Sequence, residues 1–502
     1  MNVISMRTFL SLMLIFMFNE LIAQFSSKLN ISKSLDYVDQ VKTDSIISFY
    51  TNQNGQTGVI RDSKKNIVFD VFDKDLKKNH TQIIERHKKE TIVGDLFFGN
   101  EIRVFTEYAI RKNERILYCH IFNIEDYKHS QVIVYETVIG GRQALYSEMK
   151  DHQIAFTLSN DGQYLAIASD NLDKNDDSFL VRVFHSNTLE EVYTNTFLDN
   201  SVNYFELQDL AISNSGVVYS LGKLYLNGRS EKKGGEANYT YILNKVDKGV
   251  NKALSVEMDD LHVETMAISL MENQIHLLGL FSEKNVSKVK GGCSFLVNLE
   301  TFSITSNLRA DLPIEVFEEI YGTERAHRKQ KKELSNFNID YLLTDNSGNT
   351  YILAEEFYMT GSYSSGALMG AVGGGSSVPH YDDILVLKFK SSGDLEWGRG
   401  LFKRSNEHSY NAFLKNGSVH IILNSGKDLL EKEDGRTKIS KGWLESSALY
   451  NFTFSKEGLE SNHKILDYEE GYRYLPQLGT YHNNKFIMMS SGKKRKHFAI
   501  LD

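Results

Sequence analysis

Carboxylates are the side chains in this sequence that could most directly do chemistry. The chain contains 65 Asp and Glu residues. Two carboxyl groups flanking a sugar bond are the working groups of most glycoside hydrolases. With so many acids, the sequence alone does not single out such a pair. Glycan hydrolysis by paired carboxylates therefore stays open as an alternative, with no residue assigned to it.

One short acidic run has the spacing of calcium ligands. In DKNDD, Asp173, Asn175 and Asp177 alternate as in the opening of an EF-type calcium loop. Ser178 stands where that loop needs Gly, and Phe184 stands where it needs a bidentate Glu. The run therefore favours a polar hairpin loop over a calcium site.

Motifs for zinc, nucleotide and nucleophilic chemistry are absent from the sequence. The 15 His are scattered, and neither H-E-x-x-H nor C-x-x-C occurs. There is no G-x-S-x-G, and the Gly tract at 370–375 lacks the Lys-Ser/Thr of a phosphate loop. The sialidase repeat is echoed only by Ser159, Asp161 and Gly162. We therefore expect no cofactor and no metal, and assign no catalytic residue.

Two basic clusters and one Gly-rich tract are the candidates for partner contact. The clusters HRKQKK (327–332) and GKKRKH (492–497) are typical of solvated surfaces, but either could bind an acidic partner or an anionic glycan. The tract at 361–378 predicts a loop within one blade, whose apolar residues would contact a partner if exposed. The candidate contact residues are Arg328, Lys329, Lys331, Leu368, Met369 and Val372.

Composition excludes several classes of protein. With 41% apolar residues, the chain can build a sizeable core. Its net charge of −8 does not favour binding to nucleic acid. Two cysteines cannot form a disulfide scaffold, and the apolar surroundings of Cys119 and Cys293 favour two buried thiols.

The N-terminus predicts an export signal. Residues 1–23 combine Arg7, an apolar run from Phe9 to Phe18 and a small residue, Ala23, before Gln24. The run is too short to span a bilayer, and no later segment is long enough either. We therefore expect cleavage between Ala23 and Gln24, no membrane span in the mature chain, and a periplasmic or extracellular location.

Hairpins dominate the rest of the chain. Segments such as 154–170, 210–228 and 341–357 each hold two apolar runs around a turn rich in Asn, Asp, Ser and Gly. Two hairpins in succession make a four-stranded antiparallel meander, which recurs along the chain as the blades of a β-propeller do. Few prolines fit such a chain, because proline cannot donate to a strand ladder. Candidate first strands begin near Ser45, Ile92, His152, Glu206, Glu264, Ile339, Ser409 and Tyr474.

This count predicts an all-β, single-domain propeller over residues 24–502, with eight blades favoured and seven next. The last unit, 472–502, has room for only three strands. The segment 28–39 could supply the fourth, so that the N- and C-terminal strands pair and no strand edge is left exposed. One short helical insertion is expected at 311–334, where Ile314, Phe317, Ile320 and Tyr321 share a face. A pair of separate β-domains remains the structural alternative.

The segment 339–404 carries a resemblance to known proteins. The hairpin Asp345, Gly348, Asn349 and Tyr351 is followed by a strand ending at Asp394 and Trp397. This pattern resembles the repeat of exported bacterial β-propeller proteins, and the leader ending in Ala-Gln is similar to those of Bacteroidota. The resemblance implies a fold and a scaffolding or binding habit, without implying a reaction.

The sequence thus favours a non-enzymatic, exported propeller that binds or scaffolds an unknown protein or glycan in the bacterial cell envelope. A propeller glycan hydrolase with paired carboxylates in its central pocket is the first alternative. A subunit of an envelope protein assembly is the second.

Overall fold

The computed structural model of the chain is all-β, as the hairpin pattern predicts. It describes residues 28–502 except 40–44, 64, 112–113, 139–153, 171–178, 198–202, 229, 235, 258–260, 284–287, 363–375, 406–409, 435, 440–446, 469–472 and 491–495. Over these residues it holds eight four-stranded antiparallel sheets, three two-stranded pairs and two α-helices. The β-propeller fold and the favoured count of eight blades are confirmed.

The chain divides by its internal contacts into two compact units. The smaller comprises Met1–Val38, Ser409–Asp428 and Lys441–Asp502, and the larger comprises Asp39–His408 and Leu429–Ser440. The prediction of a single domain over residues 24–502 stays a prediction.

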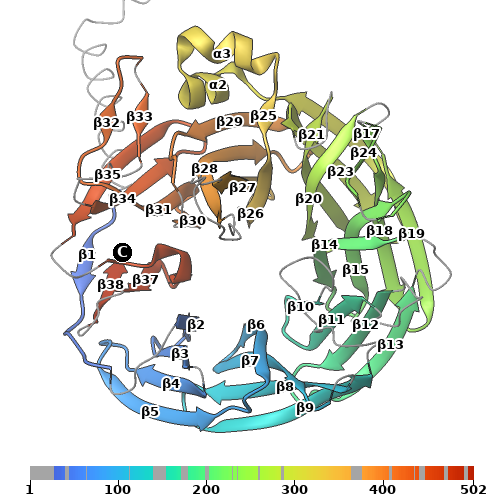
Figure 1. The fold of residues 1–502 in the computed structure, drawn as a ribbon, viewed down its shortest axis with the longest axis vertical. Coiled ribbons are helices and arrows are strands. Elements are labelled where there is room, and N and C mark those ends of the chain that lie inside the picture. The colour runs from blue at the N-terminus through green and yellow to red at the C-terminus, as the bar shows by residue number, and fades with distance from the viewer. Residues whose placement is uncertain are drawn as a thin grey trace, which may run out of the picture. The chain divides into compact units, whose positions relative to one another are not determined.

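Six blades belong to the larger unit and follow one another along the chain (Figure 1). The first two are β2 (Ser45–Thr51), β3 (Thr57–Ser63), β4 (Asn66–Phe72) and β5 (Lys78–Glu85), then β6 (Glu90–Phe98), β7 (Glu101–Ala109), β8 (Glu114–Asn123) and β9 (His129–Val138). The next two are β10 (Ile154–Leu158), β11 (Tyr164–Asp170), β12 (Phe179–His185) and β13 (Glu191–Phe197), then β14 (Phe205–Ile212), β15 (Val218–Tyr225), β18 (Tyr239–Asp247) and β19 (Val250–Val256). The last two are β20 (His262–Leu270), β21 (Gln274–Ser282), β23 (Gly291–Asn298) and β24 (Ser303–Asp311), then β26 (Phe337–Thr344), β27 (Thr350–Ser362), β28 (Ser376–Phe389) and β29 (Leu395–Leu401).

The smaller unit holds two further blades. One consists of β30 (Tyr410–Lys415), β31 (Ser418–Gly426), β34 (Ser447–Phe454) and β35 (Glu460–Asp467). The other consists of β36 (Thr480–His482), β37 (Lys485–Met489), β38 (Phe498–Leu501) and β1 (Ile31–Lys33), preceded by the 3-10 turn Pro476–Leu478. Strand β1 is the outer strand of this blade and places Ile31 opposite Leu501. The predicted pairing of the terminal strands is therefore confirmed.

The remaining elements are insertions within or between blades. They are the pairs β16 (Lys232–Lys233) with β17 (Glu236–Ala237), β22 (Lys288–Val289) with β25 (Leu334–Ser335) and β32 (Leu430–Glu431) with β33 (Thr437–Lys438), and the helices α2 (Ile314–Tyr321) and α3 (Thr323–Gln330). The helical insertion is thus two helices, because Gly322 adopts φ 84° between them. The excursion at 426–441, which its charge predicts as a loop, contains the hairpin β32–β33.

Both faces of a blade are covered, so the middle strands are mostly buried and rich in apolar residues, although buried polar side chains such as Asp70 and His276 interrupt them. In β21, every residue after Gln274 is buried. Ile67, Phe69 and Val71 of β4 share one apolar cluster with Ile102 and Val104 of β7 in the next blade. Such clusters between successive blades fix the blades of the larger unit against each other.

Tight turns join the hairpins where the sequence predicts them. Asp345 accepts backbone hydrogen bonds from Ser347 (2.8 Å) and Asn349 (2.9 Å), and Gly348 adopts φ 78°. Gly216 occupies the same place in another blade, with φ 82°. The turn requires a residue with positive φ at this position, and glycine adopts that conformation without steric cost.

Five first strands carry a β-bulge near their start, which the sequence did not reveal. The extra residue adds local twist where successive first strands approach one another. The register shifts lie between Ile46 and Ser48, Ile92 and Gly94, Leu207 and Asp209, Val263 and Thr265, and Ile339 and Tyr341.

Cys119 and Cys293 are both free and buried, so the expectation of two buried thiols is confirmed. Burial raises the pKa of each thiol to about 12. Neither is a reactive thiolate at neutral pH.

Candidate functional site

The helical insertion is anchored to its blade through α2. Helix α2 lies against β29 (Figure 1). Its residues Val316, Phe317 and Ile320 are buried in one apolar cluster with residues of β27 and β28. Glycine on β29 allows this close approach, since a Cβ at Gly400 would lie 2.8 Å from Cγ1 of Ile320. The Glu319 carboxylate then accepts a hydrogen bond from the Gly400 backbone N–H (2.7 Å). The packing and this bond fix α2 on the strand.

Helix α3 is attached far more lightly and carries the basic cluster. Ala326 is its single buried residue. We call the cations of α3 and the turn after it the α3 surface: Arg325, Arg328, Lys329, Lys331 and Lys332. All are exposed except Lys329, which is half-buried. Its Nζ lies 4.4 Å from the centre of the Tyr321 ring.

The cations of the α3 surface crowd one another. Burial lowers the pKa of Lys329, and Lys332, Arg328, Arg404 and Lys288 lower it further. Positive charge is therefore concentrated here on a chain whose net charge is −8. A surface of this kind attracts anions.

Beside the α3 surface lies an acidic group that we call the Arg404 cluster: Arg404, Glu356, Asp382 and Asp383. The Arg404 guanidinium reaches Asp382 at 2.8 Å, Asp383 at 2.9 Å and Glu356 at 3.9 Å. The three carboxylates are buried, whereas the Arg404 side chain is 31% exposed. Arg404 thus joins a buried acidic group to the surface.

Burial dominates the electrostatics of the cluster. It raises the pKa of Asp383 to about 8, although Arg404 opposes the rise and Glu356 and Asp382 add to it. It also raises the pKa of Glu356. At neutral pH Asp383 is therefore largely a neutral acid. The adjacent pair Glu355 and Lys403 is buried and forms its own ion pair.

Aromatic rings border the cluster, and cations cover them. Arg404, Lys432 and Arg436 lie 5.2, 4.9 and 4.5 Å from the centre of the Phe402 ring. Arg436, from the β32–β33 hairpin, also donates a hydrogen bond to the Ile320 carbonyl at 2.6 Å. These contacts hold the β32–β33 hairpin against the helical insertion.

The strand extension of β27 and β28 forms another border of the cluster. The Tyr358 hydroxyl donates to Asp382 at 2.8 Å, and its ring stacks on His380 at 4.7 Å. Burial raises the pKa of Tyr321 on the side of α2, and Glu356 and Asp383 raise it further. The cluster therefore lies between α2, the extension and the residues after β29.

The sequence located part of this site. Arg328, Lys329 and Lys331 all lie on or directly after α3. The other predicted contacts, Leu368, Met369 and Val372, lie outside the described residues, as do Ala23, Gln24 and the acidic run at 173–177.

The Arg404 cluster itself was missed. Its signal was three charged doublets at the ends of apolar strands: Glu355–Glu356, Asp382–Asp383 and Lys403–Arg404. Each doublet alone is typical of a solvated loop. Only the antiparallel pairing of β27 with β28 and of β28 with β29 brings them together.

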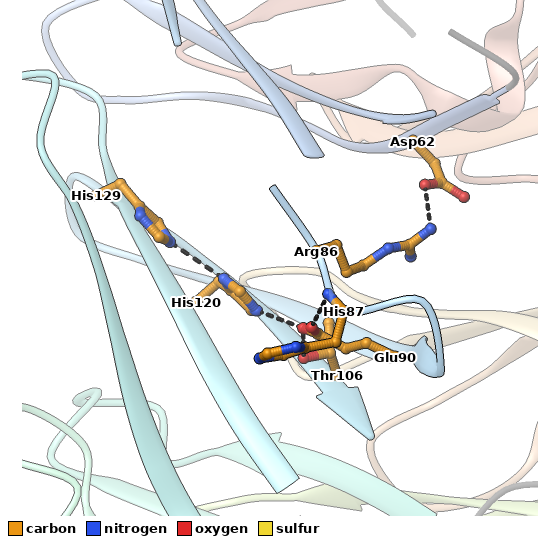
Figure 2. A network of polar contacts seen from close by, with 7 residues as sticks. All are labelled: Asp62, Arg86, His87, Glu90, Thr106, His120 and His129. Atoms are coloured by element: carbon orange, nitrogen blue, oxygen red, sulfur yellow. Dashed lines mark hydrogen bonds and ion pairs between the residues drawn. The ribbon is translucent and has the colours of Figure 1, made fainter. Parts of the chain in front are cut away.

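A second polar network crosses the blade of β6–β9 (Figure 2). The Glu90 carboxylate accepts hydrogen bonds from Thr106 (2.6 Å) and the His87 backbone N–H (3.0 Å). His120 Nε2 lies 2.8 Å from Glu90, and His120 Nδ1 lies 3.1 Å from Nε2 of His129. With His120 donating to the carboxylate, its other nitrogen accepts from His129.

The hydrogen bonds of this network connect neighbouring strands and pair its polar side chains with one another. Burial raises the pKa of Glu90, but hydrogen bonds from His120 and Thr106 outweigh that effect and lower it overall. Burial and the neighbouring His120 lower the pKa of His129 to about 4. Both are thereby held in their deprotonated forms at neutral pH.

Metal-binding groups and membrane-spanning helices are both absent from the part of the chain that the structure describes. No group of three or more His, Cys, Asp or Glu side chains is arranged to hold a metal ion. No helix there has the length and apolar character needed to cross a membrane.

No protein-family model and no curated protein matches the chain. Solved structures similar to it include three whose chains it covers almost entirely. An uncharacterized protein from Listeria monocytogenes EGD-e is 8% identical, with coverage of 91% of this chain and 94% of that one and a TM-score of 0.39. The Dos1 propeller is 7% identical, with 94% of each chain covered and a TM-score of 0.35. The polysaccharide lyase Uly1 is 10% identical, with coverage of 81% of this chain and 89% of that one and a TM-score of 0.36. Similarity at this level indicates no activity or ligand for this chain.

Proposed function

We propose that this chain is an exported binding or scaffolding propeller of the bacterial cell envelope, and that it docks an acidic protein segment on the α3 surface. The observation that carries the proposal is the crowding of cations around Lys329, whose pKa burial and neighbouring charges lower. Such crowding costs free energy in the isolated chain, and a bound polyanion relieves it.

An acidic protein segment suits the surface better than an anionic glycan does. Sugars commonly stack on open aromatic faces, whereas the rings here carry cations: Lys329 covers Tyr321, and Arg404 lies over Phe402. The helix has 8 residues and spans about 12 Å. A short acidic segment can follow such a helix.

Catalysis by paired carboxylates remains the alternative function. Burial raises the pKa of Asp383 to about 8, as a catalytic acid requires, and Asp382 is a second carboxyl beside it. However, Asp383 is completely buried, and a catalytic acid must touch its substrate. Its burial favours binding over catalysis. A role as a subunit of an envelope assembly is compatible with the same docking surface.

Charge reversal on α3 tests the proposal. The triple variant Arg325→Glu, Arg328→Glu and Lys331→Glu should bind a fluorescein-labelled oligoglutamate peptide at least about tenfold more weakly than the unmodified chain. Each exposed ion pair contributes up to about 1 kcal/mol, and 1.4 kcal/mol is tenfold in affinity. Fluorescence anisotropy at 0.05 and 0.15 M salt measures the change.

The matched control reverses three exposed lysines elsewhere on the larger unit: Lys232, Lys233 and Lys252. This control should keep the affinity, because its charge change is equal but lies on another blade. Equal losses in the two variants would mean that net charge rather than the α3 surface governs binding. If the chain binds polygalacturonate more tightly than the peptide, the partner of the α3 surface would be an anionic glycan rather than an acidic protein segment.

A further inference from the structure

Arg404 pairs with the carboxylates of the Arg404 cluster and also acts on the neighbouring α3 surface. It contacts Asp382 and Asp383 at 2.8 and 2.9 Å, and it is also one of the cations that lower the pKa of Lys329. Its backbone has φ 55°, and the next residue is tied to β28: the backbone N–H of Tyr381 donates to the Ser405 carbonyl at 2.9 Å. The guanidinium is therefore held between the two groups by the chain itself.

Asp383 is the member of the cluster most isolated from water. It is completely buried, and its Oδ1 accepts the Lys403 backbone N–H at 3.1 Å. The charged and titratable groups that face it come from every neighbouring element. They are Glu356 on β27, Asp382 on β28, Arg404 after β29 and Tyr321 on α2. Behind them, Tyr358 on β27 bonds to Asp382, and the Lys403 ammonium pairs with Glu355.

The ionisation of Asp383 falls in an accessible range of pH. Its pKa is about 8, because burial outweighs the attraction of Arg404. The carboxyl is mostly neutral at pH 7, and it becomes mostly ionised beside Arg404 as the pH rises through its pKa. Each added negative charge lowers the local potential felt by an anion on the neighbouring surface.

We infer that Asp383 controls how tightly the α3 surface holds its acidic partner, with binding strong while the carboxyl is neutral and weakened once it ionises beside Arg404. This inference rests on the proposed function. It adds a regulatory group, Asp383, that contacts neither the partner nor the cations of the α3 surface. Asp383 acts on that surface through Arg404. A unit charge on a buried carboxyl near the bound anion should change affinity about three- to tenfold, because buried charges are screened less by salt than exposed ones.

The test compares the pH dependence of oligoglutamate binding in four proteins. In the unmodified chain, Kd should rise about three- to tenfold between pH 7 and pH 9. Asp383→Asn mimics the neutral acid and should remove that rise. Asp394→Asn makes the same Asp-to-Asn substitution on the exposed turn between β28 and β29, away from the Arg404 cluster, and should retain it. Glu356→Gln removes a charge that raises the pKa of Asp383, so it should move the midpoint to lower pH.

Lys329 needs a separate control, because its lowered pKa would also weaken anion binding as pH rises. Lys329→Arg keeps a cation that does not deprotonate in this range. An unchanged pH dependence in this variant supports Asp383 as the titrating group. Circular dichroism establishes that each variant is folded.

The outcomes separate the two proposals. If the unmodified chain binds no oligoglutamate at any pH, the proposed function fails and the inference fails with it. If it binds and Asp383→Asn keeps the full pH dependence, only the inference is overturned. Loss of the dependence in Lys329→Arg would also overturn it, and would assign the titration to Lys329.

Discussion

Burial, more than any charged partner, holds several single ionisable residues of this chain in one protonation state. His129 is the clearest example, since His120 and burial keep it neutral (Figure 2). Asp383 is the opposite case, an acid kept protonated by its burial. Such groups make the stability of the fold depend on pH.

His129 gives a prediction for acid stability. Its folded pKa of about 4 lies below the unfolded value of about 6.5. The unfolded state therefore binds more protons, and stability falls as pH drops from about 6.5 towards 4. His129→Gln keeps a donor for His120 without titrating. Urea unfolding at pH 7 and pH 5 should show a loss about 1–2 kcal/mol smaller in this variant than in the unmodified chain.

The control for this experiment is His327→Gln on the exposed side of α3. It removes a histidine without disturbing a buried network, so the loss between pH 7 and pH 5 should match that of the unmodified chain. A His129→Gln variant with an unchanged loss would show that His129 is not held neutral by the fold.

At the scale of elements, the contact between α2 and β29 positions the whole candidate site. A Cβ at Gly400 would approach Ile320 to 2.8 Å and the Val316 carbonyl to 3.1 Å. Gly400→Ala should therefore destabilise the chain by about 1–3 kcal/mol, because a packed interface does not yield easily. Thermal unfolding measures the loss. The double variant with Ile320→Ala should lose less than the sum of the two single variants, since the shortened side chain makes room.

Additive losses in the two single variants and the double variant would mean that the added methyl group does not act through contact with the Ile320 side chain. Binding of oligoglutamate gives a second measurement. Displacing α2 should also move Tyr321 and the α3 surface above it, so Gly400→Ala should weaken binding as well as stability.

The sequence predicted elements well where local chemistry determines them. Turns such as Asp345–Asn349 carry their own hydrogen bonds and a left-handed glycine, so hairpins such as 341–357 were identified directly. The insertion was expected as one helix because its apolar face was visible, while the break at Gly322 was not. The bulges were missed because one extra residue does not alter an apolar pattern.

The Arg404 cluster depends on pairing between strands that lie far apart in the sequence. Glu356 and Asp383 are separated by the long excursion between β27 and β28, and no local pattern links either to Arg404. Lys329 was identified because a basic cluster is visible in the sequence, but its neighbours across the surface were not. A site assembled by tertiary pairing therefore had to be found in the structure.

At the scale of the molecule, the last blade is built from both ends of the chain. Strand β1 is its outer strand, and Leu29, just before β1, is buried in the apolar cluster of this blade. The ring of Tyr37 stacks on Phe498 at 5.8 Å, and its backbone N–H donates to the Lys496 carbonyl at 2.8 Å. The blade is therefore incomplete without the segment that follows the predicted leader.

Removing that segment tests how far the propeller depends on it. A chain beginning at residue 40 should be at least about 3 kcal/mol less stable than one beginning at residue 28, from the lost burial of Leu29 and the lost strand pairing. It should also aggregate, because β38 would present an unpaired edge. Urea unfolding and size-exclusion chromatography measure the two effects. Leu29→Ala in the longer chain should lose about 2–4 kcal/mol without aggregating, since it keeps the strand. A shortened chain that stays monomeric and equally stable would show that the other strands of this blade suffice without β1.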